Sequence, residues 1–191
     1  EGTGGGKIQK AAEQAGTASA GHVADARQSS ASARRQAQIS RLRYSEPIGI
    51  ETLTKEVTDH IQQYTQVGGA RPFGVGLLIG GIEDGAPRLY ETDPSGTPYE
   101  WKAVSIGANR GDLQEYLEEN YADGLDLDGG IELALHALAT TNDGDLEPAG
   151  VDVATIDVDS EQFHELTNDE IETPLDALKL LPSENDEDDE P

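Results

Sequence analysis

The sequence predicts an α+β fold in which one antiparallel sheet packs on another and pairs of helices cover the outside. The order of predicted elements indicates this architecture: two helices, three strands, two helices, two strands and a last helix. A clear helical period between Ile50 and Tyr64 and an apolar run from Phe73 to Ile82 support it. The 191 residues are enough for one domain with a substantial core.

The amino-terminal part is the least regular. Residues 1–20 are mostly Gly, Ala, Gln, Thr and Ser, and Ile8 alone cannot anchor a strand, so we expect a flexible or degenerate leader. A helix with a stripe of small residues is expected from Gly21 to Tyr44. It carries Arg27, Arg34 and Arg35, which form a candidate contact surface for an acidic neighbour. A solvated helix face with local ion pairs explains these arginines equally well.

A second helix and three strands follow. Apolar residues at spacings of 3, 4, 4 and 3 define the helix: Ile50, Leu53, Val57, Ile61 and Tyr64. The strands are expected at 73–82, where both faces should be buried, and at 88–92 and 99–106. Turn sequences at 83–85 and 93–96 separate them, which predicts an antiparallel meander.

The carboxy-terminal part alternates helices with a hairpin. We expect one helix that starts at its cap Asn109 and continues through Asn120. A second helix is expected at 128–141, capped by Asp128. The apolar positions that the second of these should bury are Ile131, Ala134, Leu135 and Leu138. Strands are expected at 151–158 and 162–166. A last helix should start at the capping box of Thr167 and Glu170 and be interrupted at Pro174. Residues 183–191 form an acidic tail that cannot bury itself.

The charge limits the partners. The formal net charge is −25, from 38 acidic and 13 basic residues, so nucleic acid and anionic membranes are not expected partners. A folded protein adapted to a salt-rich cytosol and a disordered acidic chain both fit this charge. The periodic apolar segments favour folding from about Ile48 onward. The longest apolar run is too short to span a bilayer and we find no signal peptide, so a cytoplasmic protein is expected.

The motifs of the usual active sites are missing from the sequence. Residues 74–79 (GVGLLI) do not match the dinucleotide-binding motif GxGxxG, because Ile79 stands where the motif has its last glycine. The four histidines are isolated, there is no cysteine, and no GxSxG nucleophile motif occurs. We therefore predict no catalytic residues, no cofactor and no metal site.

Three segments together resemble one family. Residues 19–27 (SAGHVADAR) resemble the start of the first long helix of proteasome α-subunits. Residues 62–75 (QQYTQVGGARPFGV) resemble their helix-to-strand hinge, and residues 87–96 (PRLYETDPSG) the hairpin that follows. The resemblance extends from about Gly16 to Thr173. The acidic excess and tail indicate a halophilic archaeal member.

This resemblance implies a four-layer α-β-β-α sandwich of the amino-terminal-nucleophile hydrolase type over residues 21–182. It also implies a non-catalytic subunit of a seven-membered outer ring, stacked on the β-subunits of a threonine-type protease. That ring gates substrate entry and binds the tails of a regulatory ATPase. In the pocket that binds these tails, the resemblance identifies Gly21, and His22 follows it in the sequence. The residues that make up the architectural hinge are Gly68, Gly69, Arg71, Pro72, Phe73 and Gly74.

The sequence also departs from the family. The family's gate segment, first helix and opening strands precede the residues seen here, so we expect this chain to lack them. Residues 11–17 are poor strand material where the family has a strand, and serines replace bulkier residues at 29–32. These departures favour, as an alternative, a degenerate paralogue that acts as an acidic interaction module. A stand-alone amino-terminal-nucleophile hydrolase is a weaker alternative, because it would need Thr, Ser or Cys where Glu1 stands.

Overall fold

The computed structural model describes residues 8–20, 33–35, 37–38, 47–67, 76–92 and 97–183, and for residues 60–67 only the backbone. The described residues belong to two compact units. Unit 1 comprises residues 1–108 and 154–164, and unit 2 comprises residues 109–153 and 165–191.

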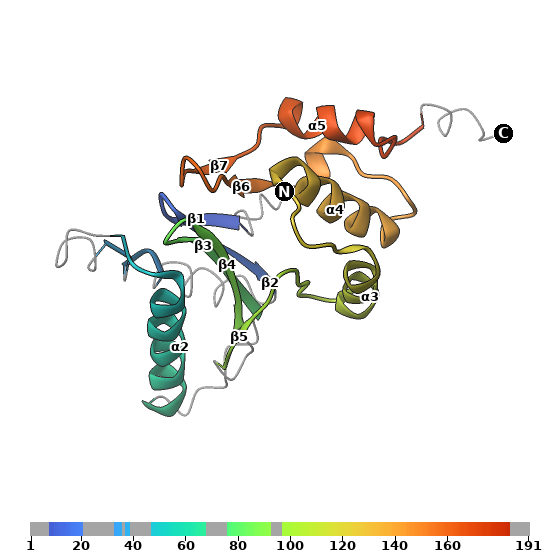
Figure 1. Ribbon diagram of the computed structural model, residues 1–191. Helices are drawn as coiled ribbons and strands as arrows, with labels where there is room; N and C mark the ends of the chain where they lie inside the picture. The colour runs from blue at the N-terminus through green and yellow to red at the C-terminus, as the bar shows by residue number, and fades with distance from the viewer. Residues whose placement is uncertain are drawn as a thin grey trace. The chain divides into compact units, whose positions relative to one another are not determined.

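Unit 1 is built on a five-stranded antiparallel sheet with the order β1-β2-β3-β4-β5 (Figure 1). The strands are β1 (Ile8–Ala12), β2 (Ala15–Ala20), β3 (Gly76–Glu83), β4 (Ala86–Thr92) and β5 (Pro98–Glu100). The predicted meander is therefore confirmed as β3-β4-β5. Its first turn has Asp84 and Gly85 at φ of 52° and 75°, the left-handed pair that matches the twist of a two-residue hairpin.

The prediction of a flexible leader is wrong for residues 8–20, which form β1 and β2. Their strand pattern is hidden in the sequence because the buried side chains of the two strands are small: Ala11, Ala15, Thr17 and Ser19. These strands gain order from β3, with which β2 pairs from Ala15↔Gly81 to Ala20↔Gly76. Pairing with the rest of the sheet therefore stabilises strands whose residues have only a weak intrinsic preference for strand structure.

Helix α2 (Ile50–Val67) lies along one face of this sheet (Figure 1). Ile50, Leu53 and Val57 are fully buried, as their spacing predicts, and share a core cluster with Leu77, Ile79 and Tyr90 of the sheet. Ala33 and Ala37, in the helical residues 33–35 and 37–38, belong to the same cluster. They confirm part of the small-residue stripe predicted for residues 21–44. The side chains of Ile61 and Tyr64 are not among those described.

Two expectations for the sheet need correction. β3 was predicted to be buried on both faces, but Leu77 and Ile79 on one face are buried whereas Leu78 on the other is only half-buried. The strand expected at 99–106 ends at Glu100, because the chain leaves β4 after Trp101. Ile106 then lies beside Gly76, and Gly107 lies beside Ala20, at the ends of β3 and β2.

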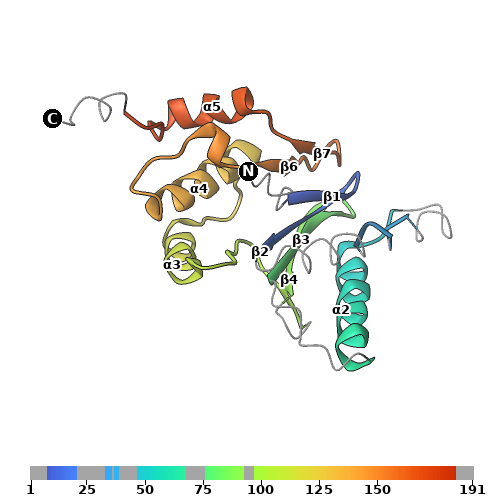
Figure 2. The same cartoon turned by 180° about the vertical axis from the view of Figure 1, so that it is seen from behind.

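A second sheet has two strands, β6 (Ala154–Ile156) and β7 (Phe163–Glu165), which confirms the predicted hairpin in a shorter form. The helices of unit 2 are α3 (Arg110–Asn120), α4 (Leu127–Thr140) and α5 (Asn168–Ala177), with a short 3₁₀ helix η1 (Pro148–Gly150). Figures 1 and 2 both show α4 and α5 side by side. Leu135, Ala139, Leu146, Ile171, Leu175 and Leu180 form their common core.

The helix ends correct two predictions and confirm a third. Asn109 stands at the start of α3, but its side chain makes no cap hydrogen bond there. The cap of α4 is Asp126, not Asp128, and it accepts a hydrogen bond from the Gly129 amide at 2.8 Å. The capping box of Thr167 and Glu170 is confirmed.

Two further predictions for unit 2 are wrong. Ala134 and Leu138 of α4 are exposed, because the helix buries the stripe that contains Leu135 and Ala139 instead. Pro174 does not interrupt α5, which continues to Ala177. A proline removes one hydrogen bond and crowds the preceding turn, but buried Ile171 and Leu175 hold both sides of it in the core.

Candidate functional site

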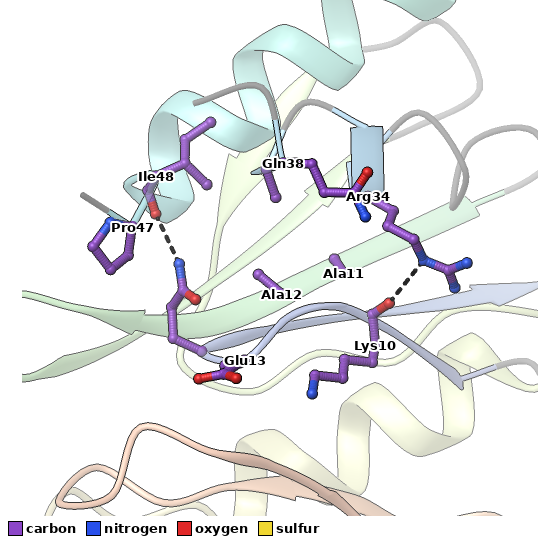
Figure 3. A pocket seen from close by; sticks show the side chains of 10 residues that line it. Lys10, Ala11, Ala12, Glu13, Arg34, Gln38, Pro47 and Ile48 are labelled. Carbon is purple, nitrogen blue, oxygen red and sulfur yellow. Dashed lines mark hydrogen bonds between the residues drawn. The ribbon is translucent and has the colours of Figure 1, made fainter. Parts of the chain in front are cut away.

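A cavity in the described part of unit 1 lies between the β1–β2 turn, the helical residues Arg34, Ala37 and Gln38, and Pro47 and Ile48 before α2 (Figure 3). It has a volume of about 350 Å³. Two hydrogen bonds cross it. Gln14 Nε2 donates to the Ile48 carbonyl at 3.4 Å, and Arg34 Nε donates to the Lys10 carbonyl at 3.4 Å. Both bonds tie the β1–β2 hairpin to the helical side of the cavity.

The lining is apolar within and polar at the rim. Ala11, Ala37 and Ile48 are buried, whereas Arg34 and Gln38 are exposed. Gln14, whose amide bonds to the Ile48 carbonyl, is also buried. None of these side chains is a nucleophile paired with a base, so the cavity has the character of a contact surface.

A second polar cluster surrounds Arg88 of β4. Its guanidinium forms a two-pronged pair with Glu100 of β5, with Nε–Oε1 at 2.6 Å and Nη2–Oε2 at 3.2 Å. Nη1 lies 3.0 Å from Glu83 of β3, and Nη2 lies 3.8 Å from Glu51 of α2. Arg88 also donates to the Tyr90 hydroxyl and lies 5.4 Å from the centre of that ring. One side chain thus connects three strands to α2.

The electrostatic effects in this cluster follow from its hydrogen bonds. The bond from Arg88 is the main cause that lowers the pKa of Glu100, and the same bond raises the pKa of Arg88. Burial raises the pKa of Tyr90 more than the neighbouring positive charge lowers it. All three groups therefore keep their charge states near neutral pH, which suits a structural cluster and not a proton-transfer site.

The structure describes few of the site residues that the sequence predicted. Gly21, His22, Arg27 and the hinge residues 68–74 lie outside the described residues. Arg34 and Arg35 are described, and both are exposed on the helical segment beside the cavity. The Arg88 cluster was not among the sites predicted from the sequence. The alternation of Arg88 and Tyr90 along a predicted strand could have shown that they share a face, although their acidic partners come from distant segments.

Within the described residues, no group of three or more potential ligands is placed to bind a metal ion. None of the helices described there is long and apolar enough to cross a bilayer.

Unit 1 combines an antiparallel sheet with helices, and the whole fold is mixed α+β, of the class predicted from the element order. Residues 4–156 match the family described as Proteasome subunit, and the chain belongs to this family. This family is consistent with a fold of the amino-terminal-nucleophile hydrolase type.

Three similar proteins come from halophilic archaea. The chain is 72% identical over 181 residues to proteasome subunit alpha 1 of Haloferax volcanii, covering 95% of this chain and 72% of that protein. It is 70% identical over 178 residues to proteasome subunit alpha of Haloquadratum walsbyi, covering 93% and 71%. It is 64% identical over 184 residues to proteasome subunit alpha 1 of Haloarcula marismortui, covering 96% and 71%. The prediction of a halophilic archaeal α-subunit of the proteasome core particle is confirmed.

Proposed function

We propose that this chain is a non-catalytic structural and gating subunit of the seven-membered outer ring of the proteasome core particle, in the cytoplasm. The observation that carries the proposal is the similarity to archaeal α-subunits over 95% of the chain. The absence of nucleophile motifs from the sequence supports a non-catalytic role. In this role the chain contacts neighbouring α-subunits, β-subunits and a regulatory ATPase.

The proposal extends to a four-layer sandwich. On the face of the five-stranded sheet opposite α2, Gly16, Gly80, Leu89 and Trp101 follow one another across the strands. A Cβ atom at Gly16 would lie 2.7 Å from the ring of Phe163, and the Phe163 amide donates to the Glu13 carbonyl at 2.6 Å. Leu89 and Trp101 are only half-buried. A second sheet that begins with β7 would cover this face.

The sandwich can be tested at Phe163. Phe163→Ala should lower the free energy of unfolding by about 1 to 2 kcal/mol, because a half-buried ring loses its contact with the sheet. An unchanged denaturation midpoint would show that the ring does not pack on Gly16.

The role as a subunit is tested by co-expressing the tagged chain with a proteasome β-subunit of Haloferax volcanii at molar salt. We expect the β-subunit to be recovered with the chain, and native mass spectrometry to show both in one particle. We also expect the isolated chain to lack peptidase activity. Failure to recover the β-subunit would favour the degenerate paralogue, and peptidase activity of the chain alone would favour the hydrolase.

A further inference from the structure

Four aspartates of this chain stand directly before a glycine, and all four are exposed. They are Asp84, Asp123, Asp128 and Asp143. In such a pair the amide nitrogen of the glycine can attack the side-chain carboxyl carbon of the aspartate, because a residue without Cβ leaves this approach open and the main chain free to turn. Exposure does not distinguish the four positions. The state of the glycine amide and of the chain around it therefore decides which pair reacts.

Two of the four pairs have a glycine amide that is already hydrogen-bonded. Gly129, in the first turn of α4, donates to Asp126 Oδ1 at 2.8 Å. Gly144 donates to the Ala139 carbonyl at 2.9 Å. Each amide has to leave its acceptor, and an ordered turn has to open, before the nitrogen can reach a carboxyl carbon. The pairs that begin at Asp128 and Asp143 are therefore protected.

The pair Asp84–Gly85 is held in another way, by the hairpin between β3 and β4. Glu83 and Ala86 on either side of the turn are paired with each other, and both turn residues have left-handed φ values. Closing a ring requires rotation of the main chain between the aspartate and the glycine, and this pairing restricts the rotation. We expect this position to be partly protected.

The pair Asp123–Gly124 has neither form of protection. It lies in the connection between the end of α3 at Asn120 and the start of α4 at Leu127 (Figure 1). In the part of the chain that the structure describes, the Gly124 amide makes no backbone hydrogen bond. A Cβ atom at Gly124 would meet nothing within 4 Å, so the surroundings do not resist rotation there. The Tyr121 hydroxyl donates to Asp123 Oδ1 at 3.4 Å, a long bond from within the same connection.

We propose that Asp123–Gly124 is a site of spontaneous succinimide formation, which converts part of Asp123 to isoaspartate. The carboxylate takes up a proton, the Gly124 nitrogen forms a bond to Cγ, and the hydroxyl leaves as water with the amide hydrogen. Water then opens the ring at either carbonyl and restores aspartate or gives isoaspartate, with no oxidation or reduction. Isoaspartate carries the main chain through its side chain, so the connection becomes one methylene longer. This inference does not depend on the proposed function.

The test incubates the folded full chain at molar KCl and neutral pH in water labelled with heavy oxygen. Each ring opening introduces one labelled oxygen, and fragment ions in mass spectrometry assign the label to a residue. We expect label at Asp123 to accumulate at least about tenfold faster than at Asp128 or Asp143, whose glycine amides must first leave a hydrogen bond and an ordered turn. Asp84 should fall between them. In denaturant all four positions should take up label at similar rates, because only the folded chain distinguishes them.

A matched pair of variants assigns the reaction to this aspartate. Asp123→Glu keeps the charge but would need a six-membered ring, which closes far more slowly, so the label at this position should be lost. Asp128→Glu should leave the label at Asp123 unchanged, and circular dichroism checks that both variants fold. Equal labelling of Asp123 and Asp128 in the folded chain would overturn the proposal. Label that persists at position 123 in Asp123→Glu would also overturn it.

Discussion

The two hairpins of the five-stranded sheet reach the same structure by different means. The β3–β4 hairpin carries its own large apolar residues, among them Leu77, Ile79 and Tyr90, and a turn with two left-handed residues. The β1–β2 hairpin offers mainly alanine, glycine, serine and threonine, so its burial depends on larger side chains from α2 and β3. The β3–β4 hairpin can therefore be predicted from the sequence, whereas the β1–β2 hairpin forms only in its tertiary context.

The largest expected effect tests this dependence on α2. Leu53→Ala should lower the free energy of unfolding by about 3 kcal/mol, because a fully buried leucine in the shared cluster leaves a cavity. Denaturant unfolding measures it. We expect amides of residues 8–20 to lose hydrogen-exchange protection before those of 76–92. Equal loss in both segments would show that the hairpins do not differ in their dependence on α2.

The next effect tests the close approach between β2 and β3. Gly81→Ala should cost about 2 kcal/mol, because its Cβ would lie 2.4 Å from the Gln14 carbonyl oxygen and 2.5 Å from Ile50 Cδ1. Gly80→Ala is the matched control, since its Cβ would meet atoms no nearer than 3.7 Å. If both variants unfold at the same denaturant concentration, the close approach is not a constraint.

A smaller effect is expected at the turn of the weaker hairpin. Gln14→Ala removes the amide that donates to the Ile48 carbonyl and leaves that buried oxygen without this partner. The cost should be about 1 kcal/mol, measured by thermal unfolding. Gln38→Ala, at an exposed position beside the same cavity, should change stability little. Equal costs at both positions would contradict a specific role for the Gln14 bond.

The smallest effect concerns the stronger hairpin and its pH dependence. The bond from Arg88 lowers the pKa of Glu100, so the ionised group stabilises the fold above its ordinary pKa, and this stability is lost as the pH falls through the lowered value. Glu100→Gln should therefore show a shallower loss of stability below about pH 4.5. Unfolding at several pH values checks this, and identical profiles for the variant and the unmodified chain would contradict it.

Helices and strands can be predicted from the sequence where the pattern of their own side chains determines them. The spacing of Ile50, Leu53 and Val57 predicts α2, and the Thr167–Glu170 capping box predicts the start of α5. Prediction fails where the deciding contact comes from elsewhere in the chain. Ala15 is a strand residue because Gly81 lies opposite it, and the chain leaves β4 after Trp101 where Ile106 crosses to Gly76.

The same reason explains what the structure shows of the candidate site. Arg34 and Arg35 are exposed, and their role as a contact surface stays a prediction. The cavity beside them and the Arg88 cluster join segments far apart in sequence, such as Gln14 with Ile48 and Arg88 with Glu51. No local pattern marks such pairs.

The most direct test of the account is hydrogen exchange of the folded chain at molar salt, followed residue by residue through 8–20. These residues form β1 and β2 of the sheet, and residues 10–14 line one side of the cavity. The account predicts that the amides of β2 that pair with β3 are protected, as are those of 76–83. Exchange of residues 8–20 at the rate of an unfolded peptide would contradict it and restore the flexible leader that the sequence alone predicts.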